Sequence, residues 1–292
     1  MRIINARALA PQVNHWLATS RQPRVLHIFD HACNVINERR EILSVVTPHI
    51  GEGPFNLVVD EYLFSNDLGV ESLVSIVDGS LLLGGLRIHV TNAKLWHPRP
   101  DWESLHARKN DILRLLTQLH ISSDLKTSFT AYLSRAADLH HSVLPIPQSL
   151  VSSLSSALAT ADSASARKIA SRLAGTGIGL TPSGDDFLMG AIYASWIIHP
   201  AEAVHAFARD IASTAASLTT SLSAEWLRSA GRGEVGIRWH EFFESLLSGD
   251  PLHIRVAMEN ILQIGETSGA DAFRGFYNTL MTWGELPQQE SK

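Results

Sequence analysis

The strongest constraint on the fold is a change of pattern near residue 98. Before it, short apolar or β-branched runs recur at spacings of roughly ten residues, punctuated by Gly, Asp and Pro. Most of these runs have no helical pattern between them, which favours an antiparallel barrel or sandwich. Two prolines in the segment 96–102 end this region, and Asp101 can cap a following helix. The predicted strands are 25–29, 42–47, 55–59, 73–77 and 86–90.

After residue 102 the apolar residues follow a helical period, as in Ile112, Leu115, Leu116 and Leu119. We therefore expect an α+β protein, with a small antiparallel β barrel or sandwich domain at 1–98 and a mostly α-helical domain at 99–292. The further predicted helices are 125–139, 150–158, 164–173, 187–198, 201–218, 223–230, 239–247, 252–264 and 273–283.

Composition narrows the class of protein. The chain has 292 residues, of which 45% are hydrophobic and 18% charged, so it can bury a core that divides in two. A net charge of -5 without a basic tract gives no reason to expect a nucleic-acid partner. The single Cys33 excludes an intrachain disulfide. Without an export signal or an apolar run of about 18 to 20 residues, we expect a cytoplasmic protein that is not embedded in a membrane.

The segment 175–190 is the most specific local signal, because it joins a glycine-rich turn to an apolar helix. Ser183 is predicted to cap this helix. Asp185 and Asp186 then fall in the first turn, where the exposed amides and the helix dipole favour carboxylates. The structural alternative is that the segment is only a well-capped helix start.

A second segment, 268–275, repeats the pattern S-G-x-D-x-x-x-G of 183–190 without gaps. The repeat places Asp271 at the position of Asp186. Both copies follow a turn rich in Gly and Thr, so two helix N-termini are expected to face one ligand. Glu266 would add a third carboxylate if the two helices converge.

Backbone amides in such turns bind phosphate or carboxylate groups without a basic side chain. Two adjacent aspartates would repel a bare anion. Asp185 or Asp186 is therefore expected to orient an amide or ammonium group, to hold a divalent metal, or to act as an acid or base beside the anion.

Other polar residues could complete such a site. Thr219, Thr220 and Ser221 can bind phosphate or cap a helix. Three arginines near the turn at 231–235 could balance a dianionic ligand, although surface arginines need no such explanation. They are Arg228, Arg232 and Arg238.

Several motifs of the chain together carry a family resemblance. They are G-x-G-L-T-P-S-G-D-D-F-L-x-G at 177–190, T-T-x-L-S at 219–223 followed by Ala230-Gly231, T-S-G-x-D at 267–271, and Gly53-Pro-Phe55. In these motifs, and over nearly its whole length, the chain resembles the AllH family of bacterial oxamate carbamoyltransferase subunits.

The resemblance implies a subunit of a three-subunit enzyme of allantoin and purine catabolism. Such an enzyme splits oxalurate with phosphate into oxamate and carbamoyl phosphate, and its other subunits are FdrA-like and AllG-like. The expected ligand is then a small anion: carbamoyl phosphate, oxamate or oxalurate. No cofactor is firmly implied, and a divalent metal stays open. The chemistry needs an anion cradle, donors to the carbonyl oxygen and a group that handles the nitrogen proton.

On this hypothesis the catalytic residues are Asp185, Asp186 and Asp271. The predicted substrate-binding residues are Gly179, Thr181, Ser183, Gly184, Thr219, Thr220, Ser221, Thr267, Ser268 and Gly269. Two alternatives stay open: a noncatalytic scaffold or ligand-binding subunit of a complex, and a stand-alone metal-assisted enzyme acting on another amide or carboxylate.

Overall fold

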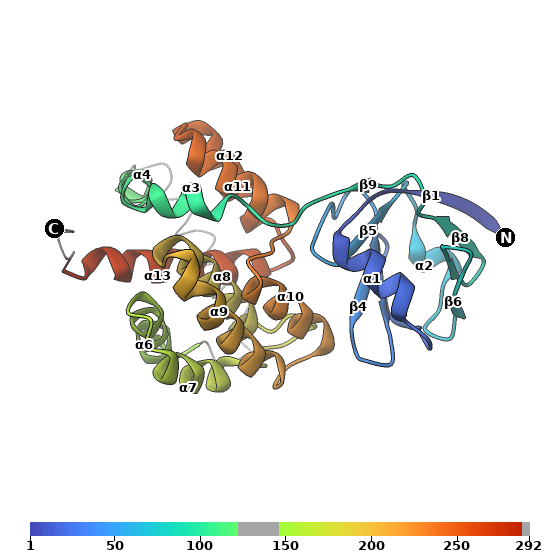
Figure 1. Ribbon diagram of the computed structural model, residues 1–292, viewed down its shortest axis with the longest axis horizontal. Coiled ribbons are helices and arrows are strands. Elements are labelled where there is room, and N and C mark those ends of the chain that lie inside the picture. The colour runs from blue at the N-terminus through green and yellow to red at the C-terminus, as the bar shows by residue number, and fades with distance from the viewer. Residues whose placement is uncertain (122–145, 288–292) are drawn as a thin grey trace. The chain divides into compact units, whose positions relative to one another are not determined.

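The computed structural model describes residues 1–121 and 146–287, so the helix predicted at 125–139 lies outside the described residues. The chain divides into two compact units (Figure 1). The first comprises Met1–Pro98 with Val235–Ile237, and the second comprises Arg99–Glu234 with Arg238–Lys292. The first unit is built on a β sheet and the second is helical, which confirms the predicted α+β class.

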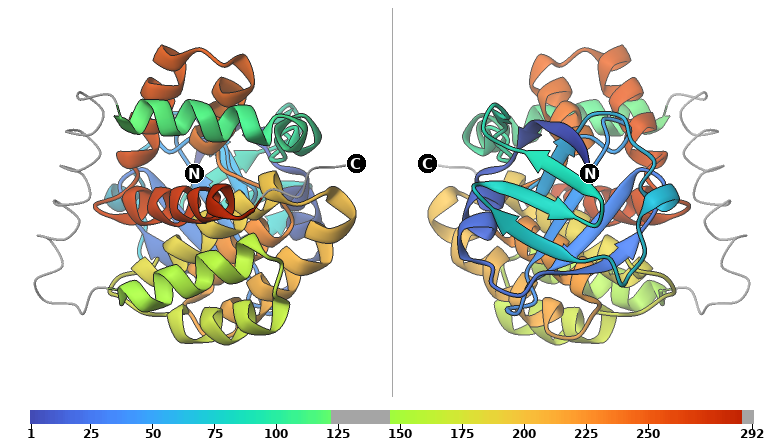
Figure 2. Two further views of the ribbon diagram at one scale, coloured as in Figure 1. Left: turned by 90° about the vertical axis from the view of Figure 1, so that its left-hand side faces the viewer. Right: turned by 90° about the vertical axis from the view of Figure 1, so that its right-hand side faces the viewer.

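The first unit is a nearly closed barrel. Its strands follow the order β2-β3-β4-β5-β1-β8-β7-β6, with β9 paired to β1, and Figure 2 shows β6, β7 and β8 side by side. A bridge between Arg24 and Leu73 brings the two edges together. The strands are β1 (Arg2–Leu9), β2 (Arg24–Ile28), β3 (Ala32–Ile36), β4 (Ile42–Val46), β5 (Asn56–Val59), β6 (Val74–Val77), β7 (Ser80–Leu83), β8 (Leu86–His89) and β9 (Lys94–Leu95).

The sheet is mixed rather than purely antiparallel, because β1 runs parallel to β8 and β9, and β4 runs parallel to β5. Its core contains Cys33, Val35, Leu43 and Leu57, and Trp16 joins it from helix α1 (Pro11–Thr19). A short helix, α2 (Phe64–Asp67), follows β5.

The described helices of the second unit include every helix predicted within the described residues, together with a first one, Trp102–Ala107, that was not among the predicted ranges. They are α3 (Trp102–Ala107), α4 (Lys109–Ile121), α6 (Gln148–Ala159), α7 (Ser163–Leu173), α8 (Ser183–Ile198), α9 (Ala201–Ala216), α10 (Ser221–Gly231), α11 (Ile237–Ser248), α12 (Pro251–Leu262) and α13 (Ser268–Glu285). Helix α8 is buried on nearly every side, as its almost wholly apolar sequence requires. No helix in the described ranges is long and apolar enough to cross a membrane.

Helices α8 and α13 cross in backbone contact at two glycines. A Cβ on Gly190 would lie 1.7 Å from the carbonyl oxygen of Ala272, and a Cβ on Gly275 would lie 2.0 Å from that of Phe187. Gly190 and Gly275 occupy the same position in the repeated motif, and so do Phe187 and Ala272. The two copies therefore make the same contact twice: the glycine of each copy lies against the carbonyl oxygen at the equivalent position of the other copy.

The repeat extends beyond the motif to three helices, α6–α7–α8 and α11–α12–α13. In the first copy Ala161 has φ +55° and Asp162 caps α7. In the second, Gly249 has φ +73° and Asp250 caps α12. Each S-G-x-D segment thus begins the third helix of a similar unit.

Candidate functional site

The two copies of the motif meet where α8 and α13 begin. Thr181 Oγ1 lies 2.9 Å from Ser268 Oγ, and both hydroxyls hydrogen-bond the side chain of Asp186. Asp186 is 5% exposed and Asp271 is 6% exposed, and their charges interact. The structure therefore brings together Thr181 and Asp186 from one copy with Ser268 and Asp271 from the other.

Asp185 points to a different set of partners. Its Oδ1 accepts a hydrogen bond from the backbone N–H of Gly175 at 2.9 Å, and its Oδ2 accepts from Ser223 Oγ at 2.8 Å and from Thr219 Oγ1. Burial raises the pKa of Asp185, and these three hydrogen bonds oppose the shift. The carboxylate thus ties the glycine-rich loop and the start of α10 to α8.

We expect Asp185→Ala to lower the free energy of unfolding by roughly 1–3 kcal/mol, because it leaves the Gly175 N–H and two hydroxyls without their acceptor. Asp185→Asn should cost less. Its oxygen can keep the Gly175 bond, while its amide donates to hydroxyls that can also accept. Urea unfolding of the purified variants measures both effects, and an Ala variant as stable as the parent would contradict this role.

Asp186 is the more unusual carboxyl group. Its Oδ2 is buried and has no hydrogen-bond partner among the described residues. The pKa of Asp186 is raised well above its ordinary value, chiefly by burial and further by the charges of Asp271 and Asp185, against the hydrogen bonds from Ser268 and Thr181. Asp186 therefore holds a proton at pH values where an exposed aspartate is ionised, and a neutral carboxyl group does not repel an anion.

This shift predicts a pH dependence of stability. An aspartate whose folded pKa lies above its unfolded value of 3.8 binds more protons in the folded state. The free energy of unfolding should therefore fall as pH rises from about 4 through the raised pKa, with Asp185 acting in the same direction. We expect Asp186→Asn to flatten this fall in urea unfolding from about pH 5 to about pH 8. Identical slopes for parent and variant would contradict the buried, protonated Asp186.

Several backbone amides at the two helix starts donate hydrogen bonds within the chain. The N–H of Gly184 donates to Thr176 O at 2.8 Å, and the N–H groups of Asp185 and Asp186 donate to Pro182 O. In the other copy, Gly269 N–H donates to Ile264 O at 3.0 Å. Carbonyls of the preceding turns thus take up the N–H groups of Gly184 and Gly269, and the first turn of α8 takes up those of Asp185 and Asp186, while the anion cradle at these helix starts stays a prediction.

The predicted cap is also corrected, since Pro182 rather than Ser183 is the N-cap of α8 and no side chain caps it. Gly184 and Gly269 have a packing role: a Cβ there would lie 2.1 Å from Leu173 O and 1.9 Å from Ile261 O. Each motif glycine lets its helix touch the end of the helix before it.

The loop that carries Thr181 is exposed at its tip. Gly175, Gly177 and Gly179 all have positive φ. Gly179 faces open space, and Ile178 is 67% exposed. The tip of this loop is therefore open to solvent.

The predicted hydroxyl cluster at 219–221 mostly supports this loop. Thr220 caps α10 by accepting from Ser223 N–H, and its hydroxyl donates to Leu180 O. Thr219 donates to Asp185, and Ser221 is the first residue of α10. Ser223, which the predicted set omitted, also donates to Asp185, and its place in the T-T-x-L-S segment was the available signal.

The predicted cations do not gather at the aspartate pair. Arg228 and Arg232 pair with the buried Glu225 at 3.5 and 3.4 Å, and Arg238 donates to Asn260 O.

Glu266, which was considered as a third carboxylate of the site, is exposed. Within residues 1–121 and 146–287, no group of three His, Cys, Asp or Glu side chains is arranged to hold a metal ion. Thr267 is the N-cap residue of α13, and its side chain accepts no capping hydrogen bond.

One buried phenol near the pair was not singled out in the sequence. Tyr193 lies two helical turns after Asp186 on α8, and burial and the charges of Glu234 and Asp186 raise its pKa. A spacing of seven residues along an apolar helix was the signal that could have found it.

Two models of known protein families match the chain. Residues 5–95 match a model described as the AllH family N-terminal domain, and residues 173–280, which include both copies of the motif, match one described as oxamate carbamoyltransferase subunit AllH. No solved structure matches the chain. Since the two matches cover the barrel and both motifs, the chain belongs to the AllH family.

Proposed function

We propose that this chain is a subunit of an oxamate carbamoyltransferase and that Asp186 and Asp271 lie where the carbamoyl group is transferred. The observation that carries the proposal is the Asp186 carboxyl group, buried between the two copies of the motif, with Oδ2 accepting no hydrogen bond from the described residues. A buried polar atom without a partner is costly unless a ligand uses it. Membership of the AllH family supplies the reaction class.

The reaction proposed is oxalurate plus phosphate to oxamate plus carbamoyl phosphate. A phosphate oxygen attacks the terminal carbamoyl carbon, the bond from that carbon to the oxamate nitrogen breaks, and this nitrogen takes up a proton. The neutral carboxyl of Asp186 supplies that proton, and the proton that the attacking hydrogen phosphate loses restores the carboxyl group. In the reverse direction the Asp186 carboxylate takes the proton from the oxamate nitrogen. A raised pKa suits this role, because the group must be protonated near neutral pH.

Asp271 has a supporting role in this scheme. Its charge helps to keep the Asp186 proton in place, because two close carboxylates resist being ionised together. The hydroxyls of Thr181 and Ser268 bind the anionic substrate, with the loop around Gly179 as its open side. We assign Asp185 to holding the loop rather than to the chemistry.

Phosphate also needs a positive counter-charge. No cation is among the groups that shift the pKa of Asp186 in the described part of the chain. We propose that a partner subunit, FdrA-like or AllG-like, supplies this charge when the complex forms. The name "subunit" carried by the matched family agrees with a site that is completed by another chain.

The experiment is a reconstitution with this chain and its FdrA-like and AllG-like partners. Carbamoyl phosphate formation from oxalurate and phosphate is measured with all three chains and with each omitted in turn. We expect the activity to require this chain, and full activity without it would contradict the proposal. Activity of this chain alone that is lost on chelation and restored by a divalent metal would instead support the stand-alone metal-assisted enzyme.

A further inference from the structure

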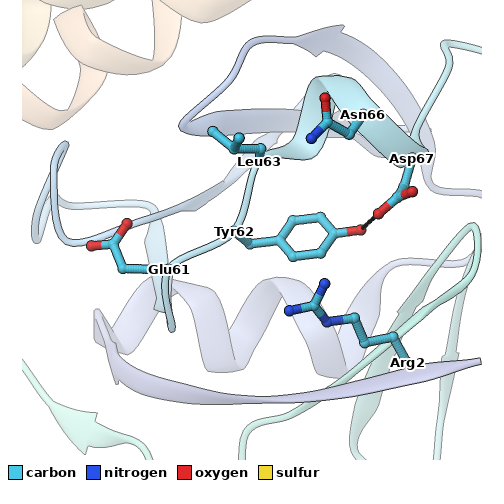
Figure 3. Close-up of a pocket in the computed structure, with 6 residues that line it drawn as sticks. All are labelled: Arg2, Glu61, Tyr62, Leu63, Asn66 and Asp67. Atoms are coloured by element: carbon cyan, nitrogen blue, oxygen red, sulfur yellow. Dashed lines mark hydrogen bonds between the residues drawn. The ribbon is translucent and has the colours of Figure 1, made fainter.

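A cavity of about 310 Å³ lies in the first unit, beside helix α2 (Figure 3). This volume is at the lower end of the range for small-molecule sites, about 300–1,000 Å³, so the cavity suits a small ligand. Its lining combines both signs of charge, an amide, an aromatic ring and an aliphatic side chain. The lining residues are Arg2, Glu61, Tyr62, Leu63, Asn66 and Asp67.

Tyr62 forms a fixed wall of this cavity. Its side chain is nearly buried, its hydroxyl donates a hydrogen bond to Asp67 Oδ2, and its ring meets that of Phe64 edge-on at 5.2 Å. Burial and then Asp67 raise the pKa of Tyr62 to about 12, so the phenol keeps its proton at neutral pH. The ring and one carboxylate are thus held in place before any ligand arrives.

Arg2 lies over this ring, with its guanidinium carbon 4.9 Å from the ring centroid. A guanidinium stacked on a ring keeps its N–H donors free at its edge, where they match a carboxylate. Within the described residues Arg2 makes no ion pair, although Asp67 and Glu61 line the same cavity. Figure 3 shows these two carboxylates on opposite sides of the Tyr62 ring.

The charges of the cavity therefore do not neutralise one another by direct contact. A ligand with only a negative charge would be attracted by Arg2 and repelled by the two carboxylates. A ligand with only a positive charge would be attracted by the carboxylates and repelled by Arg2. A ligand that carries both a negative and a positive charge can pair with Arg2 and with a carboxylate at the same time. Leu63, which is 47% exposed, and the Tyr62 ring offer apolar contact for a short side chain.

We propose that this cavity binds a small zwitterion, a free α-amino acid. Its carboxylate bonds the edge of the Arg2 guanidinium, its ammonium group bonds Glu61 or Asp67, and its side chain lies against Tyr62 and Leu63. The site is separate from the aspartate pair and does not depend on the function proposed for that pair.

The test is a titration of the full chain with L-alanine, followed by calorimetry and by the NMR signals of the Tyr62 ring, which a Tyr62→Phe spectrum identifies. Acetate and methylammonium, which each carry one of the two charges, are titrated in parallel. We expect saturable alanine binding and affinities at least about tenfold weaker for the two single-charge ligands, since each lacks one charged hydrogen bond. No saturable alanine binding, or acetate binding as tightly as alanine, would overturn the proposal.

Variants locate the binding site. Arg2→Gln and Asp67→Asn should each weaken alanine binding by about tenfold, while Asp67→Asn keeps an oxygen for the Tyr62 hydroxyl. Arg7→Gln is the matched control, because Arg7 lies on the same strand, does not line the cavity and pairs with the exposed Asp60 at 2.7 Å. Unchanged affinity in Arg2→Gln would place any binding elsewhere and overturn the proposal.

Discussion

Asp186→Asn is expected to lower carbamoyl phosphate formation by the reconstituted complex by roughly 10²–10⁴-fold, the usual contribution of a general acid. Asparagine keeps the shape of the side chain and an oxygen for the hydrogen bonds from Thr181 and Ser268. It cannot give up a proton to the leaving nitrogen. The loss should therefore appear in kcat, with a smaller change in the KM for oxalurate.

The same variant should fold at least as well as the parent. A buried carboxyl group pays for burial whenever it ionises, and the neutral amide removes that cost. Thermal unfolding therefore separates lost chemistry from lost structure.

The control for this variant is Asp210→Asn, the same substitution in a partly exposed ion pair with Arg167. It should leave both stability and rate near those of the parent. If Asp186→Asn keeps activity within about threefold of the parent, this carboxyl is not the general acid. The chain would then act as a supporting subunit.

The sequence predicted the helical unit well because its helices are long and strongly periodic. The strands of the barrel were harder to predict from the sequence. Strand β1 buries small residues such as Ala6 and Ala8, and β3 buries Asn34, whose oxygen accepts from Ser44. Alanine and asparagine are uncommon in strands, so β1 and β3 were missed, as were β7 and β9.

The convergence of the two motifs was readable because S-G-x-D-x-x-x-G occurs twice. The different roles of the adjacent Asp185 and Asp186 could not be predicted from the sequence. Asp185 faces donors from a loop and from α10, whereas Asp186 faces α13, and sequence gives no such directions for neighbours about 100° apart on a helix. The hydrogen bonds that the N–H groups of Gly184 and Gly269 donate could not be predicted either, because they depend on the path of the chain before each helix.

Gly190→Ala is expected to have the largest effect on stability, a loss of roughly 3 kcal/mol or more. The added Cβ would lie 1.7 Å from the carbonyl oxygen of Ala272, a backbone atom that no side-chain rotation can move away. Helices α8 and α13 must therefore separate. Alanine favours an isolated helix over glycine by about 1 kcal/mol, so the loss would arise from packing alone.

Gly275→Ala should have a similar effect, because its added Cβ would lie 2.0 Å from Phe187 O in the matching contact. Gly284→Ala on α13 is the control, since the atoms nearest to its Cβ would belong to the side chain of Leu113, which can rotate away, and not to a backbone. In urea unfolding, the free energy of unfolding should be far lower for Gly190→Ala and Gly275→Ala than for the parent, and close to the parent value for Gly284→Ala. Parent-like stability for Gly190→Ala would show that the two backbones are not in contact there.

The crossing also sets the distance between the two aspartates. Asp186 lies one turn before Gly190, and Asp271 lies one turn before Gly275, so a wider crossing moves the two carboxyl groups apart. Any Gly190→Ala protein that still folds should therefore lose the raised pKa of Asp186 in part, and with it the pH dependence of stability and the activity. A folded variant with full activity would mean that the chemistry does not need the aspartate pair at close range.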